Sequence, residues 1–139
     1  MNDEITSVGT GHCVHIIEDD PLILDILVFR FKDAGWQIVS SMNGEKGLEQ
    51  LEAVTPDILL LDILLPGISG YEVLETIKSN ERLKTVPVLV LSNYGQDSDI
   101  EKSKELGAVD HFVKANIIIE EIVVMAKQIV EGTYTPSNH

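Results

Sequence analysis

The sequence predicts an α/β domain in which five parallel strands form one doubly wound sheet with helices on both faces. Short apolar runs typical of buried strands alternate five times with segments of helical periodicity. Helical segments of roughly 10 to 15 residues between strands favour right-handed crossovers, which place the strands parallel. The chain has 139 residues, which fits one domain, and it shows no internal repeat.

Composition narrows the possible functions. A net charge of −13 argues against direct nucleic-acid binding, because phosphate backbones are bound by Lys and Arg. The single cysteine, Cys13, cannot form an internal disulfide. No apolar segment follows a basic N-terminal flank, so neither secretion nor membrane insertion is indicated. We therefore expect a cytoplasmic protein.

Residues outside the periodic region are predicted to be tails. Residues 1–11 are small, polar and rich in Gly and Thr, which is typical of a flexible N-terminal tail. The domain is expected over residues 12–131. Residues 132–139 are polar and are expected to form a C-terminal tail.

The first strand and helix are bounded by clear signals. Residues 13–17 form a β-rich run, and Pro21 suits the first turn of a helix over 22–34. Gly35 ends that pattern. Asp20 is expected to cap the helix rather than to bind a ligand.

The second strand is predicted over 36–40, and Asn43-Gly44 separates it from a helix over 45–53. A continuous apolar run follows, ends near Asp62 and is broken by Pro66-Gly67. Such a run is typical of a strand that is buried on both faces, so we place the third strand there.

The next elements are a helix over 71–77 and an apolar strand over 86–92. Asp97 or Ser98 is expected to cap the fourth helix, which has few apolar residues and stops at Gly107. We expect this helix to be the least firmly anchored. The last strand and helix are predicted over 109–113 and 118–130.

The first and last helices have apolar residues on two faces. The inward stripe of the first helix is predicted to be Ile23, Ile26, Leu27 and Phe31, with Leu22, Leu24, Val28 and Phe29 outside it. In the last helix the predicted stripe is Ile118, Ile122, Met125 and Ile129. The extra apolar surface has two explanations, fuller burial or an interaction face. For the last helix, the interaction would be a homodimer.

Polar residues stand where the strands end. Since the carboxyl ends of parallel strands share one edge of a sheet, these side chains should converge there. They are Glu18, Asp19, Asp20, Asp62, Ser92 and Lys114.

This edge has the groups needed to bind a metal ion and an anion. Carboxylates from two strand ends suit Mg²⁺ or Mn²⁺, with Asp19 and Asp62 as ligands. Lys114 would supply a positive charge and Ser92 a hydroxyl to a bound anion. These are the components of phosphoryl transfer, in which a carboxylate can be the nucleophile. Taken singly, Asp62 could cap a turn and Lys114 could be a solvated charge; which acid attacks stays open.

Four motifs in order resemble the receiver domain of two-component response regulators, the family that includes the single-domain chemotaxis regulator. The resemblance covers residues 12–131 and implies a flavodoxin-like sheet with strand order 2-1-3-4-5. The motifs are IIEDDP at 16–21, DILLLDILLPGISG at 57–70, PVLVLS at 87–92 and GAVDHFVK at 107–114.

The resemblance implies a role for each site residue. Asp62 would be phosphorylated by a histidine kinase or a histidine phosphotransfer protein. Mg²⁺, or alternatively Mn²⁺, would be held by Asp19, Asp62 and the backbone carbonyl of Leu64, with Glu18 acting through water.

The resemblance also implies a conformational switch. Ser92 and Lys114 would bind the phosphoryl oxygens, and a residue on the fifth strand would turn inward. That residue is His111 here, where the family usually has Tyr or Phe. Asn93 follows Ser92 where Ala is common, and Ala115 follows Lys114 where Pro is usual.

We therefore expect a stand-alone receiver that signals to a protein effector. It would be a signalling module rather than an enzyme, although it would assist its own phosphorylation and dephosphorylation. One alternative is a small phosphatase with an aspartyl nucleophile, but Leu64 stands where such enzymes commonly have a second acid. Another is an interaction module that works without phosphorylation. For the receiver, the extra apolar face of the first helix could be the docking face for a phosphodonor protein.

Overall fold

The predicted parallel sheet is present, with strand order β2-β1-β3-β4-β5. The computed structural model describes residues 11–93 and 96–136. The elements within those residues are β1 (Cys13–Ile17), α1 (Pro21–Asp33), β2 (Gln37–Ser41), α2 (Gly44–Ala53), β3 (Ile58–Asp62), α3 (Gly70–Lys78), β4 (Val88–Ser92), α4 (Asp97–Glu105), β5 (Asp110–Val113), a 3₁₀ turn (Lys114–Asn116) and α5 (Ile119–Glu131).

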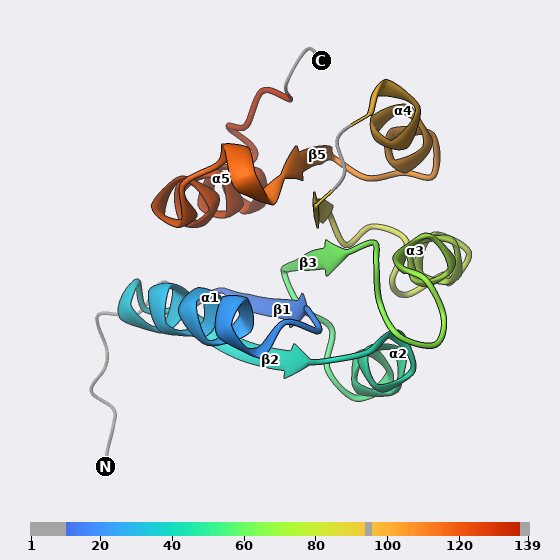
Figure 1. The fold of residues 1–139 in the computed structure, drawn as a ribbon. Coiled ribbons are helices and arrows are strands. Elements are labelled where there is room, and N and C mark those ends of the chain that lie inside the picture. The colour runs from blue at the N-terminus through green and yellow to red at the C-terminus, as the bar shows by residue number, and fades with distance from the viewer. Residues whose placement is uncertain (1–10, 94–95, 137–139) are drawn as a thin grey trace.

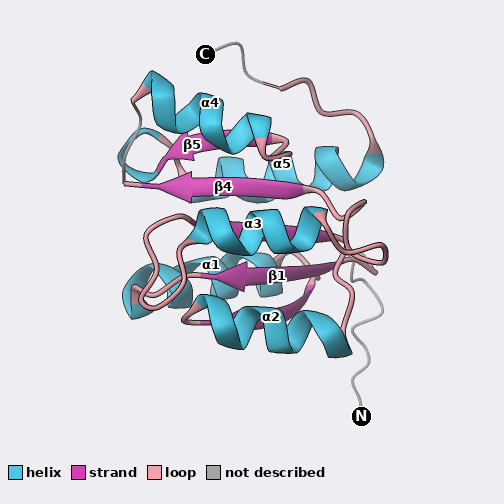
Figure 2. Cartoon of the chain, turned by 90° about the vertical axis from the view of Figure 1, so that its right-hand side faces the viewer, coloured by secondary structure: helices cyan, strands magenta, loops and turns pink. Residues whose placement is uncertain are grey.

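Helices cover both faces of the sheet. Figure 1 shows α1 and α5 on one face and α2, α3 and α4 on the other, and Figure 2 shows the strands running side by side between them. Each face buries its own apolar cluster. All residues of β3 and β4 are buried, as expected for central strands of a parallel sheet.

Strand register brings the site residues to one edge. Ile17, the last residue of β1, pairs with Leu61, and Asp62 pairs with Leu91 on β4. Ser92 in turn pairs with Val113 on β5. The residues that follow these strands therefore emerge together at the carboxyl edge of the sheet.

The first helix is capped as predicted, whereas the fourth is not. The Asp20 side chain accepts hydrogen bonds from the backbone N of Leu22 and Ile23. The N-cap of α4 is Gln96, which makes no side-chain capping bond, so neither Asp97 nor Ser98 is the cap. Asp97 instead lies in the first turn, where its charge interacts favourably with the helix dipole.

The predicted inward stripe of α1 was partly wrong. Leu24, predicted to lie outside it, is buried with Leu27 and Phe31, whereas Ile26 is 37% exposed. A helix that is apolar nearly all round has no single preferred face, and packing on the sheet selects one. Ile118, predicted to face inward, is 60% exposed because it precedes the first turn of α5.

The predicted tails are described only in part. Residues 1–10 and 137–139 lie outside the described residues, so most of the predicted N-terminal tail does too. Residues 132–136 are described, and Tyr134 contacts the sheet. None of the described helices combines the length and apolar character that a membrane span requires.

Close backbone contact at Gly70 leads to a stability prediction. A Cβ atom there would meet the Asp62 carbonyl oxygen and lie 2.6 Å from the Ile63 Cα. Because backbone atoms cannot rotate away, we expect Gly70→Ala to lower the free energy of unfolding by about 1–3 kcal/mol in urea titrations. In the control Gly47→Ala, the new methyl meets only the end of the flexible Ile17 side chain, so the loss should be smaller. Equal losses would contradict the prediction.

Candidate functional site

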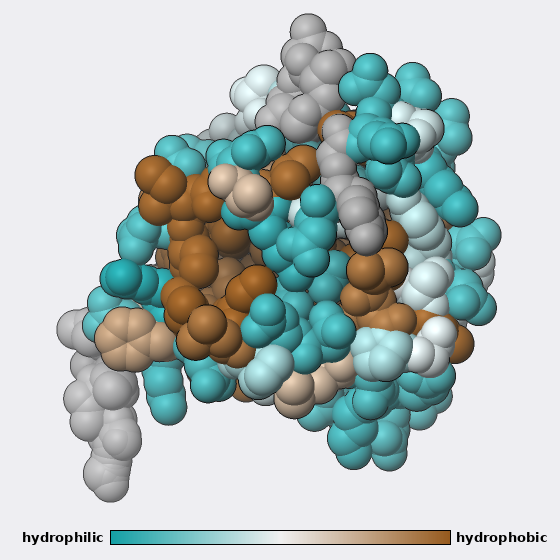
Figure 3. Space-filling model, viewed as in Figure 1, coloured by the Kyte–Doolittle hydropathy of each residue, from teal (hydrophilic) through white to brown (hydrophobic). Residues whose placement is uncertain are grey.

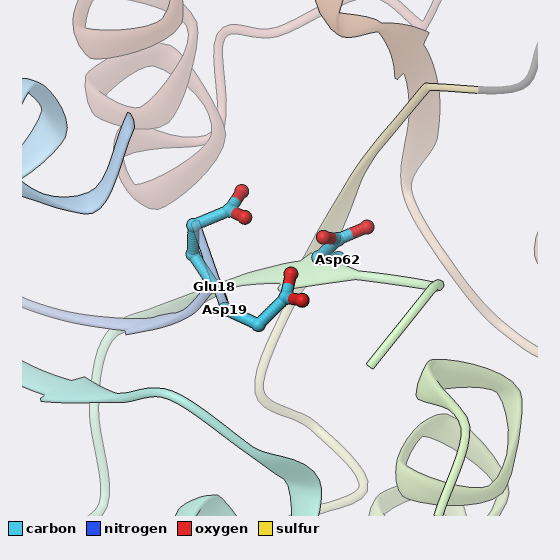
Figure 4. A group of neighbouring side chains, drawn as sticks. All are labelled: Glu18, Asp19 and Asp62. Carbon is cyan, nitrogen blue, oxygen red and sulfur yellow. The ribbon is translucent and has the colours of Figure 1, made fainter. Parts of the chain in front are cut away.

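Three carboxylates converge at the carboxyl edge of the sheet. Glu18 and Asp19 follow β1, and Asp62 ends β3. Figure 4 shows their side chains grouped in front of these strand ends, and one oxygen from each lies within 4.8 Å of the others. Glu18 and Asp62 are buried, whereas Asp19 is exposed to solvent.

Lys114 makes ion pairs with both buried carboxylates. Its Nζ lies 2.6 Å from Glu18 Oε1 and 3.1 Å from Asp62 Oδ2. Burial alone would lower the pKa of Lys114, but the hydrogen bond to Glu18 and the charge of Asp62 raise it above its ordinary value. Lys114 therefore stays protonated and partly neutralises the two acids.

The proton affinity of Asp62 is strongly perturbed. Burial and the nearby charge of Glu18 raise its pKa to about 7, although Lys114 opposes this shift. Its Oδ1 also accepts a hydrogen bond of 3.1 Å from the backbone N of Leu64. The two Asp62 oxygens are thus held by different groups, and the carboxylate has a fixed orientation.

The donor set fits a hard divalent cation. Carboxylate oxygens on neighbouring strand ends are the ligands that Mg²⁺ binds in proteins, usually with several waters. Glu18 is held by Lys114 and by the backbone N of Asp20, which donates to Glu18 Oε2 at 3.0 Å. Asp19 is the carboxylate on the solvent side, where a hydrated ion would approach.

Ser92 reaches the same edge from β4. Since Asp62 pairs with Leu91, Ser92 lies one residue farther along the neighbouring strand, and its side chain is buried. Asn93 follows and is exposed, whereas residues 94–95 lie outside the described part of the chain. Ser92 therefore lies at the same edge of the sheet as Asp62.

His111 lies apart from the carboxylates. It is fully buried on β5, and its Nδ1 is 2.8 Å from the hydroxyl oxygen of Ser103 on α4. The neighbouring Phe112 packs with the α1 and α5 cluster on the opposite face. The buried residues of α4 are only Ile100 and Ser103, which agrees with the prediction of a weakly anchored helix.

Sequence reasoning missed the direct pairing of Lys114 with Glu18. It assigned Lys114 to the anion and Glu18 to a water-mediated metal contact. The run Glu18-Asp19-Asp20 was itself a signal, because adjacent acids of this density need a cation nearby. Sequence spacing alone did not show which acid Lys114 would meet.

An apolar area borders the polar site. Figure 3 shows a brown area over α1 and α5 beside the teal centre. Leu22, Ile26 and Phe29 are exposed on α1 at helical spacing, and Ile118 is exposed before α5. A hollow of about 90 Å³ between these helices is lined by Ile23, Leu27, Leu91, Ile117, Ile119, Ile122 and Lys114, so this area reaches the site. We call Leu22, Ile26, Phe29 and Ile118, the four exposed residues, the apolar patch.

Known proteins share this fold and resemble this sequence. Residues 14–127 match the family described as the response regulator receiver domain. The chain is 35% identical to sporulation initiation phosphotransferase F of Bacillus subtilis over 114 residues, which cover 82% of this chain and 83% of that protein. A solved structure from Chloroflexus aurantiacus, described as a response regulator, has a TM-score of 0.80 and 32% identity over 86% of this chain and 98% of that one.

Other relatives are longer than this chain. The master transcriptional regulator RpaA of Synechocystis is 30% identical over 118 residues, which cover 85% of this chain and 48% of that protein. The chain thus spans about half the length of the first curated relatives it matches. The matched region contains all of the sheet except Cys13, together with the three carboxylates and Lys114. The chain belongs to the response regulator receiver domain family.

Proposed function

We propose that Asp62 accepts a phosphoryl group from a histidine kinase or a histidine phosphotransfer protein. The observation that carries this proposal is that Asp62 lies beside a second buried carboxylate, Glu18, and that Lys114 pairs with both. Phosphorylation by such proteins is typical of the receiver family, and the relative from Bacillus subtilis is named as a phosphotransferase. We assign the receiver domain to residues 12–131 and propose that it works in the cytoplasm.

Mg²⁺ is the proposed cofactor, and Mn²⁺ would fit the same oxygen donors. Asp19, Asp62 and the backbone carbonyl of Leu64 would hold the ion, and Glu18 would act through water. When bound, the ion supplies positive charge against the phosphoryl oxygens. It would also offset the mutual repulsion of Glu18 and Asp62, which contributes to the high pKa of Asp62.

The chemical step needs an ionised Asp62. One of its oxygens attacks the phosphorus of a phosphohistidine, the P–N bond breaks, and the electron pair of that bond stays on the imidazole nitrogen. The product is an acyl phosphate on Asp62. Lys114 Nζ donates a hydrogen bond to Asp62 Oδ2, so it would also be close to a phosphoryl group on Asp62. Ser92 would donate a hydrogen bond to the phosphoryl group.

The phosphorylated site would act on α4. Ser92 ends β4, which leads toward α4, and His111 contacts Ser103 on the inner side of α4. We propose Ser92 and His111 as the switch residues, with a protein effector that recognises the altered surface.

The apolar patch is proposed as the docking face for the phosphodonor protein. A donor must bring its phosphohistidine to Asp62, and the hollow between α1 and α5 is lined by Lys114, which pairs with Asp62. Apolar areas of this kind tend to mark interaction sites.

Phosphorylation is tested with Mg²⁺ and acetyl phosphate, followed by intact mass. The wild type should gain one phosphoryl group, and Asp62→Asn should gain none. Asp57→Asn is the matched control, because Asp57 precedes the same strand at its opposite end and contacts Cys13. An unmodified wild type with every donor tried would favour an interaction module, and an adduct that persists in Asp62→Asn would disprove the assignment of Asp62.

Mg²⁺ affinity should depend on pH because protons and Mg²⁺ compete for Asp62. The pKa of Asp62 is raised to about 7, so its ionised fraction rises as pH passes through that value. Calorimetric titrations should show binding about tenfold tighter at pH 8 than at pH 6. Asp62→Asn should bind more weakly and lose this dependence, while the surface control Glu49→Gln should keep it. A flat profile in the wild type would refute the predicted competition.

Docking is tested with the double variant Leu22→Gln, Ile118→Gln. Both side chains are well exposed, so the fold should be unaffected. Transfer from a histidine phosphotransfer protein that phosphorylates the wild type should slow at least fivefold, while labelling by acetyl phosphate should not change. Val124→Gln, equally exposed but on another side of α5, is the control. Equal transfer rates in all three proteins would exclude the apolar patch as the docking face.

A further inference from the structure

The chain turns back after α5. Gly132 has a φ of +80°, the backbone N of Thr133 donates to Gln128 O at 2.8 Å, and the N of Gly132 donates to Ile129 O at 3.2 Å. This pair of bonds is a Schellman motif, which ends a helix and redirects the chain. Figures 1 and 2 both show the segment leaving α5 on the β5 side of the sheet.

Tyr134 anchors this returning segment. Its hydroxyl donates to Asp110 Oδ2 at 2.6 Å, and Asp110 is fully buried at the start of β5. The other oxygen, Oδ1, accepts from the backbone N of His111 and lies 3.4 Å from Lys104 Nζ on α4. Hydrogen bonds to an ionised acceptor are roughly twice as strong as neutral ones. Asp110 therefore joins the C-terminal segment to both β5 and α4.

The segment that follows α5 lies beside the edge strand of the sheet, β5. Strand β5 is at the end of the sheet, and edge strands offer backbone groups with which another chain can pair. Tyr134 lines two hollows of about 540 and 480 Å³. The larger one has apolar walls from β5, the 3₁₀ turn region and α5: Phe112, Ile117, Val124 and Met125.

We propose that residues 132–136 are a strap that closes this side to partners and is released when α4 shifts. The strap and α4 share one attachment, since Tyr134 and Lys104 both contact Asp110. Ser103 of α4 also contacts His111, the neighbour of Asp110. A shift of α4 would remove the contacts of Lys104 and Ser103 together. The buried Asp110 carboxylate would then lose its charge partner, and water that enters to hydrate it would compete with the Tyr134 hydroxyl. Release by phosphorylation rests on the proposed function, whereas the anchor itself does not.

Backbone NMR relaxation of the full chain tests the strap. In the wild type, order parameters at Tyr134 and Thr135 should be about 0.85, as in rigid backbone. In Tyr134→Phe they should fall below about 0.6, and amide exchange at Thr133 should be about tenfold faster. Tyr71→Phe is the matched control, because it removes another tyrosine hydroxyl beside an aspartate, Asp99, and should leave the segment rigid.

The release step is tested by adding Mg²⁺ and beryllofluoride as the phosphoryl mimic. Wild-type order parameters at Tyr134 and Thr135 should fall as in Tyr134→Phe. A mobile segment in the untreated wild type, or a rigid one in Tyr134→Phe, would overturn the strap. If the resonances of Asp62 and Lys114 shift, the mimic has bound at the site. A segment that stays rigid in that case would overturn the proposed release of the strap. If those resonances do not shift, the proposed function fails. The order parameters of the untreated wild type and Tyr134→Phe still test the anchor between Tyr134 and Asp110.

Discussion

Two carboxylates that are almost completely removed from water share one lysine at the end of the sheet. Burial and the repulsion from Glu18 raise the pKa of Asp62, and Lys114 offsets these effects without cancelling them, so that pKa is about 7. A buried pair of this kind adds little net stability. One lysine between two carboxylates leaves the site with a net negative charge. A cation can bind to that charge, and a phosphoryl group can then be transferred to Asp62.

The parallel sheet makes this arrangement possible. Register places the ends of β1, β3 and β4 side by side, so residues far apart in the chain meet without any long loop. Tight backbone contact at Gly70 fixes the path of the chain just after Asp62. The position of the acid is thus determined by the central, fully buried strands, which are the least deformable part of the domain.

Local signals predicted most of the fold and the members of the site. Capping by Asp20 and the end of β3 at Asp62 were correct because short-range chemistry determines them. The inward face of α1 was partly wrong, since Leu24 and Ile26 are chemically alike and only packing distinguishes them. The contacts of Lys114 with Glu18 and of Tyr134 with Asp110 depend on tertiary geometry, which no spacing in the sequence encodes.

The polar attachment of α4 also has a thermodynamic consequence. This helix is held by Ile100, by the hydrogen bond of Ser103 to His111 and by the ion pair of Lys104 with Asp110, so a displacement of α4 would expose little apolar surface. Exposure of apolar surface is what gives conformational changes their large heat capacity. A displacement of α4 would therefore change the heat capacity little, and the enthalpy of that displacement would stay nearly constant with temperature.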